Sequence, residues 1–160
     1  MSTGQIITVV AIGLLIVLSG FFSGSETAVT AASRARLHHL EKQGNRRARM
    51  ISELMRQRER FIGAILLGNN AVNILATALA TSLLISVAGD AGVFYATIGL
   101  TLIILIFAEV LPKTYAIRNA DRVALAVAPL LLGLVWLLLP AVMAVRGVVY
   151  VALMPFGAHK

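Results

Sequence analysis

Three apolar stretches of this sequence each hold a small group of polar side chains, which hydrocarbon surroundings would make costly. In the first stretch, Ser19, Ser23 and Glu26 follow the spacing i, i+4 and i+7, so a helix would place them on one face. In the third stretch, Glu109 and Lys113 are four residues apart, in the orientation that favours an ion pair along a helix. These groups are the first candidates for chemistry.

The second stretch adds amide oxygens to this set. Asn69 and Asn70 precede Asn73 by four and three residues, so one helical face offers up to three amides. Hydroxyl, amide and carboxylate oxygens together suit hard divalent cations such as magnesium or calcium. The chain has no cysteine, and its histidines lack the spacing of a metal site, which argues against zinc.

Each of these residues also has a purely structural interpretation. Serines and asparagines often join membrane helices through hydrogen bonds. Lys113 could form a buried ion pair with either Glu26 or Glu109. Pro112 has no N–H to donate to the carbonyl of Ala108, so that oxygen is free to face a cavity.

The composition indicates that a membrane surrounds these residues. Of the 160 residues, 59% are hydrophobic and only 13% are charged, against roughly 25% charged in ordinary soluble domains. A water-soluble enzyme and a disordered chain are therefore excluded. Residues 6–32, 61–88 and 91–116 are each long enough to cross a bilayer as a helix. Residues 123–145 are also uncharged but contain Pro129 and Pro140, so this segment is either a fourth span or a kinked helix along the inner leaflet.

Nearly all of the net charge of +7 lies between the first two spans. Residues 34–60 contain nine basic and three acidic residues, which predicts a cytoplasmic loop and places the N-terminus outside. Its pattern favours two short amphipathic helices, broken near Gly44 and Asn45, on an anionic lipid surface. Nucleic acid is not an expected partner, because aromatic residues make up only 6% and do not alternate with the basic ones.

The basic residues also give a measure of depth. Glu26, Asn69 and Glu109 each lie eight or nine residues from the nearest basic end of their span, roughly 12–14 Å along a helix. The hydrocarbon half-thickness is about 15 Å. Polar groups from three helices are therefore predicted to meet near the middle of the membrane.

Three motifs in order make the sequence similar to the CorC/CNNM family of magnesium transporters. They are FFSGSETA at residues 21–28, GNNAVNI at 68–74 and AEVLPK at 108–113. The resemblance implies an all-α integral membrane fold with three transmembrane helices, a basic juxtamembrane helical hairpin (34–60) after the first, and a proline-kinked juxtamembrane belt helix (121–150) at the C-terminal end. It implies a homodimer in the cell's inner (plasma) membrane, with the N-terminus outside and the C-terminus cytoplasmic.

The resemblance further implies magnesium export, with inward sodium as a candidate driving ion. The metal ligands that it implies in this chain are Ser19, Ser23, Asn70, Asn73 and Glu109, with Asn69, Ser25 and Glu26 as further candidates. Family members continue into cytoplasmic nucleotide-binding domains, whereas this sequence ends at Lys160. We therefore expect residues 1–160 to form a single transmembrane domain without the regulatory part.

Two functions are compatible with these features, and neither is enzymatic. One is a magnesium carrier that works by alternating access. The alternative is a membrane-embedded magnesium sensor or scaffold that binds the ion without moving it. A passive channel is disfavoured, because the spans show no continuous polar stripe along their length.

Overall fold

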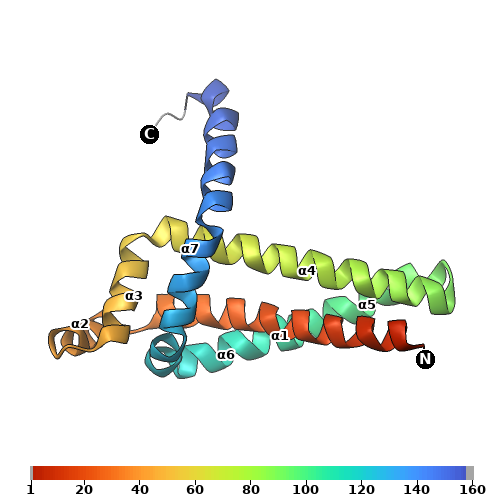
Figure 1. Cartoon of the computed structure of the whole chain (residues 1–160), viewed down its shortest axis with the longest axis horizontal. Helices are drawn as coiled ribbons and strands as arrows, with labels where there is room; N and C mark the ends of the chain where they lie inside the picture. Colours follow the sequence, from red (N-terminus) through yellow and green to blue (C-terminus); the bar gives the residue numbers. More distant parts are fainter. Residues whose placement is uncertain (1, 158–160) are drawn as a thin grey trace.

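A computed structural model describes residues 2–157, and this part of the chain is helical throughout, apart from short turns (Figure 1). Four helical segments are long and apolar enough to cross a membrane. They are α1 (Thr3–Ala31), α4 (Arg58–Ala88), a continuous rod made of α5 (Ala91–Ile103), η1 (Ile104–Val110) and α6 (Leu111–Arg118), and α7 (Ala120–Leu153), which η2 (Met154–Phe156) extends.

Polar residues at the ends of the helices define where they begin. The Ser2 hydroxyl accepts a hydrogen bond from the Gln5 N–H (3.2 Å), and the Gln5 side chain accepts one from the Ser2 N–H (3.1 Å), which forms a capping box for α1. Ser33 and Asn45 cap α2 (Arg34–Lys42) and α3 (Arg46–Arg56), each by accepting one hydrogen bond from a backbone N–H in the first turn. Gly44 adopts a φ of 89° between them, so the predicted break in the basic loop is confirmed.

The rod 91–118 contains an irregular turn that the sequence pattern does not predict. Its middle part, η1, is a π-helix, which is wider than an α-helix and often occurs at functional sites. Pro112 follows directly in the first turn of α6, where its missing N–H interrupts the regular hydrogen bonding. Glu109 lies within this widened turn.

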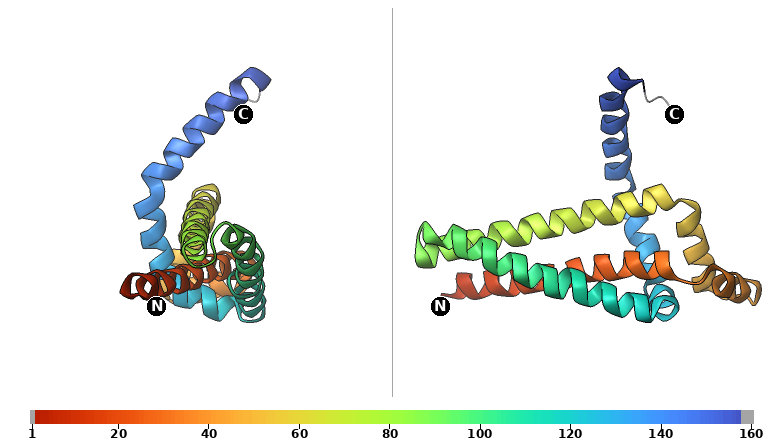
Figure 2. Two further views of the ribbon diagram at one scale, coloured as in Figure 1. Left: turned by 90° about the vertical axis from the view of Figure 1, so that its right-hand side faces the viewer. Right: turned by 180° about the vertical axis from the view of Figure 1, so that it is seen from behind.

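The three rods α1, α4 and α5–α6 lie side by side (Figures 1 and 2). The N-terminal end of α1 and the turn between α4 and α5 are at one end of the bundle. The α2–α3 hairpin and the end of α6 are at the other, so the nine basic residues of the hairpin region gather at one end. The helix α7 runs across the bundle near this basic end and then projects away from it.

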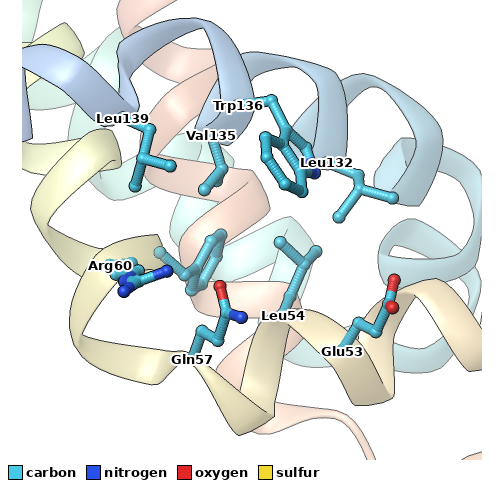
Figure 3. A pocket seen from close by; sticks show the side chains of 9 residues that line it. Glu53, Leu54, Gln57, Arg60, Leu132, Val135, Trp136 and Leu139 are labelled. Atoms are coloured by element: carbon cyan, nitrogen blue, oxygen red, sulfur yellow. The ribbon is translucent and has the colours of Figure 1, made fainter.

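Polar contacts and packing fix the first half of α7. Asp121 accepts hydrogen bonds from the Ser33 N–H (2.8 Å) and the Arg36 guanidinium (3.1 Å). Arg47 donates to the Leu125 carbonyl (3.4 Å), which Pro129 leaves without its helical partner. Apolar side chains of α7, including Val135 and Leu139, face Leu54 and Gln57 across a small pocket beneath the helix (Figure 3). Figure 2 shows α7 bending along its length while it remains helical through both prolines.

The predicted apolar helices are confirmed as helices, with ends within three residues of those expected. The differences arise because caps and turns set the ends, whereas the apolar pattern marks only the interior. The described part ends at residue 157, so residues 1 and 158–160 lie outside it.

Candidate cation site

The helix α1 approaches the rod 91–118 closely because two glycines lie at the contact. A Cβ added at Gly20 would stand 3.1 Å from Pro112 Cγ and 3.3 Å from the Phe107 carbonyl oxygen. One added at Gly24 would stand 3.4 Å from Pro112 Cβ. Small residues of this kind let membrane helices pack with their backbones near one another. The serines next to these glycines are thereby brought against neighbouring helices.

Two side-chain contacts made by α1 bring the polar groups of three helices together. The Ser19 hydroxyl donates to Asn69 Oδ1 of α4 at 2.7 Å. The Ser23 hydroxyl, one turn further along, lies 3.5 Å from Glu109 Oε1 of η1. Both serines are buried. The second contact is at the outer limit for a hydrogen bond and is therefore weak, so Glu109 is held only loosely by α1.

The other carboxylate oxygen of Glu109 has a stronger partner. Glu109 Oε2 is 3.1 Å from the Lys113 ammonium, and the two residues are one helical turn apart. Of the two pairings open to Lys113, the structure therefore shows the one with Glu109. No ion pair between residues 2 and 157 involves Glu26, which is half-buried on α1.

The asparagines of α4 do not all face the same neighbour. Asn69 points to α1, whereas Asn70 is exposed and lines a crevice between α4 and α7, beside Glu59 and Arg146. Adjacent helical residues are about 100° apart, which explains the divergence. Asn73 is half-buried and has no side-chain hydrogen bond within the described residues. Asn69 is thus the asparagine that contacts α1, through Ser19.

Ser25 occupies a different face of α1 from Ser19 and Ser23. Its side chain is buried, and its hydroxyl has no hydrogen-bond partner among residues 2–157. A buried hydroxyl without a partner is uncommon. Ser25 is therefore available as an oxygen ligand, but the structure does not place it beside Glu109.

Sequence reasoning missed several residues near Glu109. The threonines Thr77, Thr97 and Thr101 line a groove between α4 and the α5–η1 segment, and Glu109 lines it too. The i, i+4 spacing of Thr97 and Thr101 was a visible signal, but threonines are common on apolar helices and attract no notice alone. The π-helix places Glu109 in the same groove as these threonines, and the sequence pattern does not reveal a π-helix.

The arrangement offers one carboxylate and several neutral oxygens. Within residues 2–157, no group of three or more histidine, aspartate and glutamate side chains forms a multi-carboxylate or imidazole cage. Two contacts one turn of α1 apart, Ser19 with Asn69 and Ser23 with Glu109, supply the side-chain oxygens at the junction of α1, α4 and η1. All of these are hard oxygen ligands, which fit magnesium or calcium rather than a softer transition metal.

The fold and the junction together define an all-helical membrane protein with polar residues between its apolar helices. Residues 9–160 match the family described as the Cyclin M transmembrane N-terminal domain (CNNM). The chain belongs to this family, which is associated with magnesium transport and whose domain is a transporter domain rather than a known catalytic one.

Several curated proteins are similar to the chain. The UPF0053 inner membrane protein YfjD of Escherichia coli is 48% identical over 76% of this chain and 30% of its own length. A UPF0053 protein of Haemophilus influenzae is 39% identical over 81% of the chain and 31% of its own length. A chloroplastic DUF21 domain-containing protein of Arabidopsis thaliana is 36% identical over 71% of the chain and 17% of its own length. The chain thus spans less than a third of the length of these relatives.

Proposed function

We propose that this chain moves magnesium across the membrane by alternating access, with Glu109 as the charged ligand. The observation that supports this most directly is the meeting of side chains from three helices at one junction, where Ser19 contacts Asn69 and Ser23 lies beside Glu109. A carboxylate placed among hydroxyl and amide oxygens compensates part of the ion's charge and replaces some of its water ligands.

Binding requires the junction to rearrange. Magnesium binds oxygen ligands octahedrally at about 2.0–2.1 Å, so two neighbouring ligands lie about 2.9 Å apart, whereas Glu109 Oε1 and the Ser23 hydroxyl are 3.5 Å apart. An incoming cation also competes with the Lys113 ammonium for the carboxylate. Magnesium sheds water reluctantly, so we propose that it keeps some water ligands. We propose that the remaining candidate ligands contact the ion in other conformations of the transport cycle. They are Asn70, Asn73, Ser25 and Glu26.

The proposed membrane arrangement has α1, α4 and α5–α6 as three spans, with α7 as a belt on the cytoplasmic side. Two observations support it: the basic hairpin lies at one end of the bundle, and α7 runs across the spans there (Figure 1). The N-terminus would then face outward and the C-terminal end the cytoplasm. The name of the Escherichia coli relative supports an inner membrane location.

Direction, coupling and assembly are also proposals. We propose export of magnesium with sodium as the candidate driving ion, in a homodimer whose basic hairpins bind anionic lipid. Small residues allow close contact between membrane helices. Of six alanines on α1, on α4 and between α1 and the start of α2, four are buried within one chain and two are exposed: Ala28, Ala32, Ala76 and Ala80 are buried, and Ala31 and Ala35 are exposed. A dimer interface would therefore use surfaces other than the four buried alanines, and cross-linking in detergent that yields only monomer would contradict it.

Flux measurements in liposomes that contain only this chain test the proposal. A magnesium-sensitive dye inside the vesicles should report transport by the wild type and none by Glu109→Ala. Glu59→Ala is the matched control, because Glu59 is 84% exposed and pairs with Arg146 at 3.2 Å, away from the junction. Transport by Glu109→Ala at the wild-type rate would contradict the site. Magnesium binding without flux in the wild type would instead favour the sensor or scaffold.

A further inference from the structure

A groove along the side of the bundle ends at the proposed ion ligand. It lies between α4 and the α5–η1 segment, and its polar lining consists of Thr77, Thr97, Thr101 and Glu109. Apolar side chains such as Leu100 complete the walls. Along the chain, Thr97 is six residues from the start of α5 and Glu109 is twelve residues further on. The row of hydroxyls therefore leads from Glu109 towards the α4–α5 turn.

Each threonine hydroxyl donates its proton to a backbone carbonyl of its own helix. Thr77 donates to the Asn73 carbonyl (2.8 Å), Thr97 to the Val93 carbonyl (2.8 Å) and Thr101 to the Thr97 carbonyl. Each oxygen keeps its lone pairs and acts towards the groove only as an acceptor. Acceptors without protons suit a cation, or the water ligands that surround a hydrated cation and point their hydrogens outward. An anion would find no donor in this row.

The π-helix is what places Glu109 at the end of the row. At about 100° per residue, a regular α-helix would leave a residue twelve positions after Thr97 roughly 120° away from it. The wider π-turn of residues 104–110 turns less per residue, so that Glu109 lines the same groove as Thr97 and Thr101. Without it, the face would carry Ala108 instead, which is now fully buried.

We propose that this groove is the passage by which hydrated magnesium moves between Glu109 and the α4–α5 turn end of the bundle. The inference rests on the proposed transport function. The threonine oxygens accept hydrogen bonds from the ion's water ligands, and Glu109 at the inner end exchanges some of those waters for its carboxylate. The competing explanation is that the hydroxyls only satisfy their own helices and that acyl chains fill the groove.

Thiol labelling tests whether the groove contains water, and it does not depend on transport. The chain has no cysteine, so single cysteines can be introduced without removing any. We expect Thr97→Cys and Thr101→Cys in sealed vesicles to react with a membrane-impermeant thiol reagent applied from the α4–α5 turn side, and magnesium to slow the reaction. Asp90→Cys in the turn identifies that side. Ile98→Cys is the control, since Ile98 is next to Thr97 and 48% exposed but does not line the groove.

Three labelling results would overturn the proposal: no reaction at residues 97 and 101, reaction from the opposite side only, or equal reaction at residue 98. Because the readout is access rather than flux, these results stand even if the chain proves to be a sensor. The labelling results can therefore contradict the groove proposal while the flux results support the transport proposal, or the reverse.

A second experiment separates passage from binding. The double variant Thr97→Val with Thr101→Val keeps the side-chain shape but removes both acceptors. We expect magnesium flux to fall about tenfold, equivalent to ~1.4 kcal/mol for two lost acceptors, while calorimetric affinity for magnesium stays within about twofold of the wild type. Thr114→Val is the matched control, because Thr114 makes the same bond to its own helix (2.7 Å to the Val110 carbonyl) outside the groove. Unchanged flux in the double variant, or an equal loss in the control, would overturn the proposal.

Discussion

Glu109 is held by two neighbours, and a cation bound by Glu109 and Ser23 would compete with the other one, Lys113. Its Oε2 pairs with Lys113 at 3.1 Å, and its Oε1 lies 3.5 Å from the Ser23 hydroxyl. The ion pair is partly exposed, with 31% of the Glu109 side chain and 48% of the Lys113 side chain accessible. On a water-exposed helix, an i, i+4 pair contributes about 0.3–0.5 kcal/mol, which is a lower bound where less water screens the charges. The Glu109 carboxylate is therefore paired with Lys113 but still accessible to a cation.

Lys113→Met should strengthen magnesium binding. The substitution removes the competing ammonium and its repulsion of the ion, so we expect the dissociation constant to fall at least about twofold, given ~0.5 kcal/mol for the broken pair. Titration calorimetry of the purified chain measures it. Lys42→Met, in the basic hairpin, is the control and should leave the affinity unchanged. Weaker binding by Lys113→Met would mean that the lysine supports the site rather than competing for it.

The candidate site is partly predictable from individual residues. Depth along the spans predicts that polar groups of three helices lie near one level, because helix rise converts sequence position into height. In the first span this prediction rests on Glu26, whereas the residues of α1 that contact Asn69 and Glu109 are Ser19 and Ser23. Depth does not determine rotation, so the sequence did not show that Asn70 faces α7. It also gave no sign of the row formed by Thr77, Thr97 and Thr101, since that alignment depends on a neighbouring helix.

At the scale of elements, the contact between α1 and the widened turn η1 sets the site's geometry. Gly20 and Gly24 leave room for the Phe107 carbonyl and for Pro112. The apolar pattern predicts both helices correctly, because length and hydropathy are local properties. The π-helix was not predictable in this way, since regular and widened helices have nearly the same composition.

Gly20→Val should disturb this contact and the site together. A branched side chain would clash with Pro112 and the Phe107 carbonyl, so we expect a loss of stability of about 1–3 kcal/mol and weaker magnesium binding as Ser23 is moved from Glu109. Thermal unfolding in detergent and a magnesium titration measure the two effects. Gly13→Val on the same helix is the control, because nothing lies within 4 Å of its added Cβ. Equal behaviour of the two variants would show that the close approach is not needed.

At the scale of the whole molecule, charge is unevenly distributed, which is the basis of the proposed orientation. The basic hairpin region and the end of α6 lie together, opposite the α4–α5 turn (Figure 1). The helix α7 is apolar enough to span a membrane, but it runs across the bundle, and residues beyond Val142 are exposed. Composition alone could not decide between a span and a belt, because both need a long apolar helix.

Single cysteines in the cysteine-free chain test this orientation. We expect an impermeant thiol reagent to label Asp90→Cys in intact cells, whereas Gln43→Cys and Phe156→Cys should react only after the membrane is opened. Phe156 is a suitable reporter for the end of α7 because it is 82% exposed. Labelling of Phe156→Cys in intact cells would show that α7 crosses the membrane and would contradict the belt.

The central claim is that magnesium binds at the junction of α1, α4 and η1. Its most direct test is a crystal structure of the chain determined with manganese, which prefers the same oxygen ligands as magnesium and scatters X-rays more strongly. We predict a metal peak within bonding distance of the Glu109 carboxylate and of at least one oxygen from Ser19, Ser23 or Asn69, and its loss when excess magnesium is added. A peak elsewhere in the chain, with the Glu109 carboxylate still paired to Lys113, would contradict the claim.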